Sequence, residues 1–244
     1  MGDVEPNGIR YVRAVRPVSF PASDPDWDMG EGKRHQLFCE LLRAIIRSVV
    51  GAGSSVGSDQ FLYFDASDPK RKCAPDAFVK LGVPDELFET WKTWEKGTPE
   101  LCVEILSESD TREVLPLAEK LRRFHIMGVP EVIAFDADSP PGKRLRAWDL
   151  VQGDLVERIV ENETTRCRTL GLWFVIASCS NPVLEAALRL AEDHRGEGLL
   201  LSPLEQALAD KDAALASKDA AVADKDAALA EVARLREELS KLRT

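Results

Sequence analysis

The sequence lacks the closely spaced cysteines and histidines that build structural zinc sites. Its five cysteines are an odd number without any Cys-x-x-Cys pair, and its three histidines lie far apart along the chain. Four-coordinate zinc centres usually draw their ligands from such closely spaced pairs. We therefore expect reduced, buried thiols of the kind found in cytosolic proteins, and neither a zinc centre nor a histidine-rich metal cluster.

An excess of positive charge and long apolar runs are also missing. The formal net charge is -10, which excludes a uniformly basic nucleic-acid binder but leaves room for a local basic patch. No apolar run approaches the roughly 18 residues of a membrane span. Residues 1–20 carry charges where a signal peptide would need an apolar centre. We expect a soluble cytoplasmic protein that does not bind membranes.

The patterns that are present divide the chain into four parts. Residues 1–29 are rich in Pro, Asp and Gly and predict an irregular lead-in. Residues 30–180 contain a helical apolar stripe, three strand-like segments, a second helix that ends at Gly128, and further strands, the last of them over 166–177. This order predicts an α/β domain with a mixed central β-sheet flanked by helices.

The remaining residues, 181–244, predict helices. Residues 181–203 are expected to form a helix followed by a linker, and residues 204–244 are an alanine-rich heptad repeat. One heptad position is apolar throughout the repeat, whereas lysine occupies the position that would complete a coiled-coil seam. The apolar row is Leu208, Leu215, Val222 and Leu229, and the lysines are Lys211, Lys218 and Lys225. Two outcomes stay open: a homo-oligomeric coiled coil, or a solvated single helix.

Two acidic residues stand inside apolar, strand-like segments. Asp76 lies in "CAPDAFV" and Glu104 in "PELCVEILS". A buried carboxylate is costly unless something pairs with it, and two carboxylates at one sheet edge repel unless a cation lies between them. Oxygen ligands suit Mg²⁺ or Mn²⁺, which can activate water for attack on a phosphodiester. Taken alone, the pattern also fits a glutamate that faces solvent.

The wider pattern resembles the PD-(D/E)xK nuclease superfamily, although Leu106 stands where that superfamily has its lysine. More closely, residues 30–178 resemble the restriction endonuclease-like Uma (Uma-two) family. The resemblance rests on His35 and on "APDAFV", "PELCVEILSES", "AEKLRRF", "GVPEVIAFD" and "LGLWF", which follow one another in the family's order. It implies a restriction-endonuclease-like core, to which the repeat of residues 204–244 adds a long C-terminal helix or coiled coil, and a Mg²⁺- or Mn²⁺-dependent DNA endonuclease.

The same resemblance implies roles for particular residues. Asp76 and Glu104 become metal ligands with the main-chain carbonyl of Ile105, and Lys120 becomes the superfamily's lysine, moved to the following helix. Ser107 becomes a residue that supports the site's geometry. The sequence departs from the family at Glu108, where proline is usual, and at Phe124, where tyrosine is usual.

Other residues admit two interpretations each. Glu40, on the first helix, is either an additional acid near the metal or a surface residue. The basic run Lys70, Arg71 and Lys72 either meets a nucleic-acid backbone or is a solvated loop. For the whole chain, the alternative to a nuclease is a catalytically inactive nuclease fold that binds nucleic acid or recruits partners through its C-terminal helix.

Overall fold

A six-stranded mixed sheet forms the centre of the computed structural model, which describes residues 32–106, 116–179, 181 and 183–242. The strand order is β1-β4-β6-β7-β8-β9, and only the central pair β6–β7 is parallel. The strands are β1 (Ser55–Gly57), β4 (Ala77–Lys80), β6 (Leu101–Leu106), β7 (Glu131–Asp136), β8 (Leu145–Val151) and β9 (Asp154–Arg158). The predicted mixed central sheet is therefore confirmed.

Two small sheets and four helices complete the described structure. One three-stranded sheet holds β2 (Leu62–Tyr63), β3 (Lys72–Cys73) and β5 (Trp91–Lys92); the other holds β10 (Thr164–Cys167), β11 (Leu172–Ala177) and β12 (Ala187–Ala191). The helices are α1 (Lys33–Val50), α2 (Thr93–Lys96), α3 (Leu117–Met127) and α4 (Pro203–Leu242). Among the described residues, every helix is too short or too polar to cross a bilayer.

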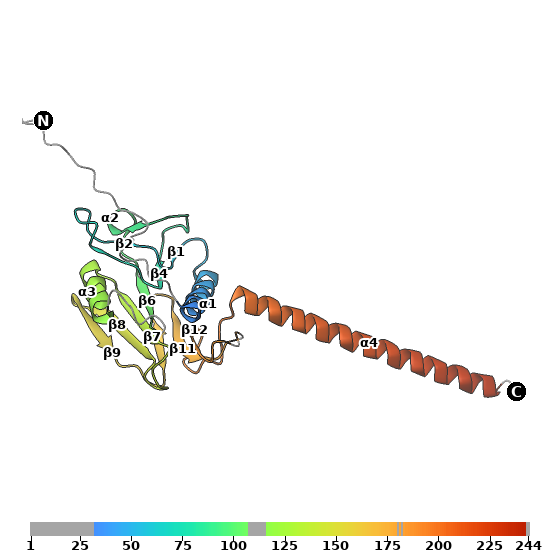
Figure 1. The fold of residues 1–244 in the computed structure, drawn as a ribbon. Coiled ribbons are helices and arrows are strands. Elements are labelled where there is room, and N and C mark those ends of the chain that lie inside the picture. The colour runs from blue at the N-terminus through green and yellow to red at the C-terminus, as the bar shows by residue number, and fades with distance from the viewer. Residues whose placement is uncertain (1–31, 107–115, 180, 182, 243–244) are drawn as a thin grey trace, which may run out of the picture.

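The central sheet separates two apolar clusters, with α1 on one face and α3 on the other (Figure 1). Successive side chains of a strand point to opposite faces. In β6, Val103 and Ile105 join the α1 cluster, whereas Cys102 joins the α3 cluster. Glu104 therefore points toward α3. A left-handed Gly128 ends that helix, as the sequence predicted.

The prediction of a helix within residues 181–203 is wrong. Residues 187–191 instead form β12, which pairs antiparallel with β11 and is buried at every position. A short apolar run that is buried on both faces carries no helical or strand period, so its sequence cannot separate the two. The single strand expected over 166–177 is likewise two strands, β10 and β11, joined by a turn. The lead-in at 1–29 lies outside the described residues.

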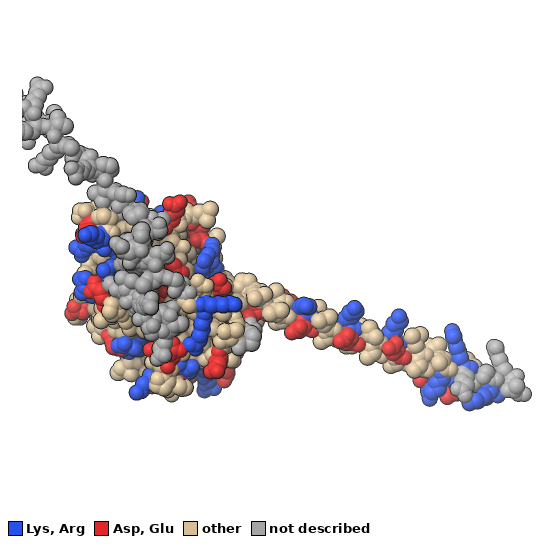
Figure 2. All heavy atoms as spheres, viewed as in Figure 1, with Lys and Arg blue, Asp and Glu red and all other residues tan. Residues whose placement is uncertain are grey.

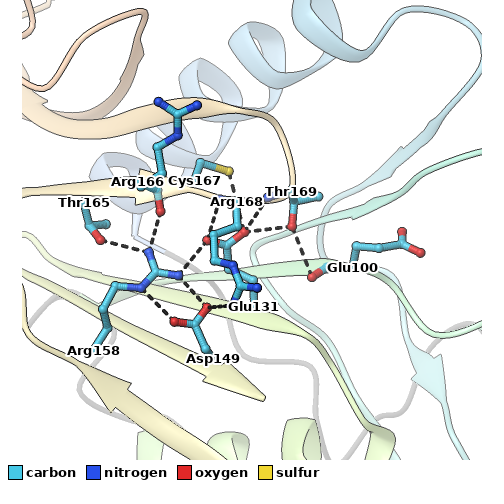
Figure 3. A network of polar contacts seen from close by, with 9 residues as sticks. All are labelled: Glu100, Glu131, Asp149, Arg158, Thr165, Arg166, Cys167, Arg168 and Thr169. Carbon is cyan, nitrogen blue, oxygen red and sulfur yellow. Dashed lines mark hydrogen bonds and ion pairs between the residues drawn. The ribbon is translucent and has the colours of Figure 1, made fainter. Parts of the chain in front are cut away.

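A buried carboxylate, Glu131, joins the β10–β11 turn to the central sheet (Figure 3). Arg158 Nη2 donates to its Oε1 at 3.0 Å, and Arg158 also holds Asp149. The main-chain N–H groups of Arg168 and Thr169 donate to Glu131 at 2.9 Å each, and the Thr169 hydroxyl donates at 2.8 Å. The charge of Glu131 is thus fully hydrogen-bonded inside the protein, as a buried charge requires.

A second buried ion pair anchors the long helix α4. Arg189 on β12 is 1% exposed and donates two hydrogen bonds to Glu205, at 3.0 and 2.9 Å. Glu205 also accepts the main-chain N–H of Ser202, and the Ser202 hydroxyl accepts the N–H of Glu205, which is a capping box. The first turn of α4 therefore belongs to the folded body, while the rest of the helix projects from it (Figure 1).

This anchor predicts where the tail can be removed. A chain ending at residue 200 loses Glu205 and leaves Arg189 buried without its carboxylate, whereas a chain ending at residue 209 keeps the pair. Breaking a buried pair on one side costs about 3 to 5 kcal/mol. Urea unfolding should show a loss of that size for the shorter chain and almost none for the longer one. Equal stabilities of the two truncated chains would contradict this role of Glu205.

Candidate functional site

Glu104 lies on β6, and Asp76 directly precedes the neighbouring strand β4. The register of β4 and β6 pairs Ala77 with Val103, so the next position along this ladder sets Asp76 opposite Glu104. The main-chain N–H of Ile105 donates to Asp76 Oδ2 at 2.5 Å. Both acids are buried, Glu104 completely. The cost of burying them must therefore be offset by nearby partners.

The partners of Asp76 come from three elements. His35, near the start of α1, has its Nε2 atom 3.2 Å from Asp76 Oδ1. Ile105 of β6 holds the other oxygen, and the Ser58 hydroxyl donates to the main-chain carbonyl of Asp76 at 2.8 Å. The carboxylate is thus fixed in one orientation between the first helix and the central sheet.

Glu104 is paired with Lys120. The Nζ atom of Lys120 donates to Glu104 Oε2 at 2.7 Å, and the Lys120 side chain is 15% exposed. Because Glu104 points toward α3 and Lys120 lies in the first turn of that helix, the four-carbon stem of the lysine spans the gap between helix and sheet. This arrangement sets an ammonium group beside the Glu104 carboxylate.

Two buried thiols, Cys73 and Cys102, lie near Glu104. Burial raises the pKa of Cys73 far above its usual range, and the nearby charge of Glu104 raises it further, while Arg123 and Lys120 oppose the shift. Burial also raises the pKa of Cys102 well above the ordinary value. Both thiols are therefore protonated at neutral pH. They act as small apolar side chains that keep the surroundings of Glu104 dry.

A pocket of about 320 Å³ opens next to Asp76, between α1 and the segment that follows β1. Ser58 both lines this pocket and holds the Asp76 carbonyl. Glu40 is exposed at the pocket, so it lies on the pocket side of α1. The lining residues are Gln36, Cys39, Glu40, Arg43, Ser58 and Asp59. Of these, only Glu40 was singled out as a candidate by the sequence.

The basic run before the Asp76 strand does not form one exposed patch. Lys70 and Arg71 are exposed, and Arg71 lies 3.3 Å from Asp65. Lys72 is only 4% exposed, with its ammonium group 4.2 Å from the centre of the Phe61 ring. The basic surface here is therefore limited to Lys70 and Arg71. Ser107, the expected supporting residue, lies outside the described residues.

Sequence reasoning underestimated two residues of this site and missed a third. From the sequence, His35 was recognised only as a histidine that matches the family, and Cys39 only as one of several buried thiols. Ser58 was not recognised as a site residue. The helical spacing of His35 and Cys39 was a signal for a shared direction along α1. No local pattern connects these two residues, or Ser58, with Asp76, because those contacts join distant parts of the chain.

Comparison with known proteins assigns most of the chain to one family. A family model named Uma2, with the description "Putative restriction endonuclease", matches residues 28–177. This range holds α1, the central sheet and α3, and therefore every residue of the site described above. No curated protein matches the chain.

The pairing of Lys120 with Glu104 makes a prediction for stability. Lys120→Met leaves the fully buried Glu104 carboxylate without its ammonium partner, and we expect a loss of about 3 kcal/mol in the free energy of unfolding. Adding Glu104→Gln removes the stranded charge and should recover much of that loss. Urea unfolding of the single and double variants measures both. If the double variant is as unstable as the two single losses combined, the two side chains are not coupled.

Proposed function

Because the chain belongs to the Uma2 family of restriction endonuclease-like proteins, we propose that it is a metal-dependent endonuclease that hydrolyses phosphodiester bonds in DNA. The proposal is supported by the strand register that sets Asp76 opposite Glu104 and by the ion pair between Glu104 and Lys120. The proposal includes the cytoplasm as the place where the protein works.

The donor set supports Mg²⁺ or Mn²⁺ as the cofactor. Two carboxylates and a main-chain carbonyl are hard oxygen ligands, which these ions prefer. Asp76, Glu104 and the carbonyl of Ile105 would hold the ion. When bound, it would acidify a water molecule and offset charge on the phosphate. Glu40, at the neighbouring pocket, is a candidate for a supporting acid, and Ser107 stays a proposal from the family pattern.

The chain's own residues prepare this chemistry in two ways. The Ile105 N–H and His35 hold the Asp76 carboxylate in place, so the ligand needs no reorganisation during the reaction. Lys120 keeps an ammonium group at the site through its bond to Glu104. From there it can orient the attacking water or donate to the oxygen that gains negative charge.

Contact with DNA must be local, because the protein as a whole is acidic. Figure 2 shows basic and acidic side chains interspersed on the visible face of the body. Lys70 and Arg71 are exposed at the end of the loop that leads to the Asp76 strand, and we propose that they contact phosphates. The alternative, an inactive binding or assembly module, would keep these contacts and the fold without cleavage.

A cleavage assay separates the two functions. With Mg²⁺ or Mn²⁺, the wild-type protein should cut plasmid or single-stranded DNA, and Asp76→Ala should abolish cutting. Lys120→Met should slow single-turnover cleavage by about two to three orders of magnitude, the scale for losing one charge-stabilising donor. Lys120→Arg should also be impaired, because the planar guanidinium group of arginine does not replace the compact ammonium group of lysine.

The matched control for that assay is Arg122→Met, which removes an exposed cation from the same helix. It should cut at the wild-type rate. Reactions run well below the unfolding temperature of each variant separate catalysis from stability. An inactive wild-type protein that still binds DNA would favour the binding module, and an unimpaired Lys120→Met would rule out a catalytic role for that lysine.

We also propose that α4 pairs in parallel with α4 of a second copy. The apolar row of this helix is exposed, and it runs between two charged rows. The first three residues of the row are each followed by a lysine three positions later and by an aspartate four positions later. The aspartates are Asp212, Asp219 and Asp226. These offsets put lysine on one flank of the row and aspartate on the other. Figure 2 shows the two colours along opposite edges of most of α4.

The order of these rows selects the orientation. When two identical helices pair in parallel about a shared axis, the lysine flank of each faces the aspartate flank of the other. Antiparallel pairing would set lysine against lysine and aspartate against aspartate, which is unfavourable. Beyond the lysines, Val232, Leu235 and Leu239 are exposed at 3/4 spacing and add an uninterrupted seam.

Single cysteines test the pairing and its direction. Under mild oxidation, Leu208→Cys and Leu229→Cys should each give disulfide-linked dimers on their own, because parallel pairing brings each position next to its own copy. An antiparallel pair would instead cross-link only in a mixture of the two variants. The wild-type protein controls for the native thiols. Light scattering should report a dimer, and a monomeric mass would overturn the proposal.

A further inference from the structure

Three side chains of different chemistry converge beside the proposed catalytic site. A ring nitrogen of His35, Cys39 Sγ and a carboxylate oxygen of Asp76 all lie within 4.8 Å of one another, and all three residues are buried. His35 and Cys39 are four residues apart on α1, so they share one face of the helix. That face points at the end of the sheet from which Asp76 comes.

We propose that these three side chains bind a thiophilic divalent cation such as Zn²⁺. Zinc bonds of about 2.0 to 2.3 Å in a tetrahedron imply ligand atoms about 3.3 to 3.8 Å apart. The 3.2 Å between His35 Nε2 and Asp76 Oδ1 is close to that separation. Thiolate and imidazole ligands select zinc over Mg²⁺, which prefers oxygen. The site is thus distinct in metal preference from the pair Asp76 and Glu104.

The surroundings support such a site. The Ile105 N–H already holds the second oxygen of Asp76, in the manner of the outer hydrogen bonds that orient metal ligands. Cys39 also lines the pocket of about 320 Å³, which gives a cation a path to the site and leaves room for water as a fourth ligand. The sequence argued against zinc because these ligands do not form a closely spaced pair with a second pair elsewhere.

The consequence rests on the proposed nuclease function. The two metal sites share Asp76, so its carboxylate cannot serve both ions in full. Zinc held by His35 and Cys39 would draw Asp76 away from Glu104 and inhibit cleavage supported by Mg²⁺. The structure thus provides a means by which a soft metal can switch off a site that a hard metal activates.

Cobalt spectroscopy tests the site without relying on activity, because Co²⁺ replaces Zn²⁺ and absorbs in the near ultraviolet when bound to a thiolate. The full-length protein should gain this absorption, and Zn²⁺ should remove it. Cys39→Ser should abolish it, whereas Cys102→Ser, which changes a buried thiol outside the cluster, should keep it. Absorption that survives in Cys39→Ser, or is absent from the wild type, would overturn the proposal.

Two further measurements keep the result decisive. Glu104→Gln should retain the cobalt absorption even though it removes a proposed Mg²⁺ ligand, so failure of the nuclease function and failure of the soft-metal site can be told apart. Should Cys39→Ser not fold, X-ray absorption at the zinc edge of the wild-type protein should show one sulfur among lighter ligands. A shell of nitrogen and oxygen alone would contradict the assignment.

Discussion

The carboxylate of Glu131 links the central sheet to the β10–β11 turn, two parts of the fold that are far apart in the sequence. It sits at the start of β7, where its own N–H bonds to Glu100 just before β6, and it holds the β10–β11 turn through Arg168 and Thr169. Arg158 of β9 binds it from the far edge of the sheet. Without this charge, the three-stranded sheet that packs on α1 would lose the hydrogen bonds of Arg168 and Thr169 to the central sheet.

The buried acids among the residues that the structure describes fall into two kinds. Glu131 and Glu205 each bind an arginine and main-chain N–H groups, and a planar guanidinium matches a carboxylate in a fixed geometry. Asp76 and Glu104 instead meet a histidine, one N–H and a lysine. A lysine is a point charge that a divalent cation can replace in electrostatic terms. The pairing of Glu131 and Glu205 with arginine therefore suits stabilisation of the fold. The pairing of Asp76 and Glu104 suits a site that exchanges partners.

The strand β12 connects the body with the tail. Leu188 and Leu190 lie in the same apolar cluster as α1. Arg189, between them, donates hydrogen bonds to a glutamate in the first turn of α4. The long helix thus starts from a fixed point on the domain, although the rest of it makes its contacts with solvent. In a parallel pair, both domains would lie at the same end of the paired helices. Two of the proposed nuclease sites would then be available to one DNA molecule, which suits cleavage of both strands.

Sequence alone determined the elements whose apolar residues recur at a clear period, and the acidic residues that interrupt an apolar segment. The stripe of α1, the alanine-rich repeat of α4 and the paired acidic strands each carry a local signal, and the motif order pointed to the family. Only the tertiary structure decided that residues 187–191 are a strand, that Lys72 is buried, and that Lys120 meets Glu104. It alone brought His35 and Cys39 to Asp76, and Glu205 to Arg189. The physical reason is the same in each case: these outcomes depend on contacts between residues far apart in the chain, and no local period records such contacts.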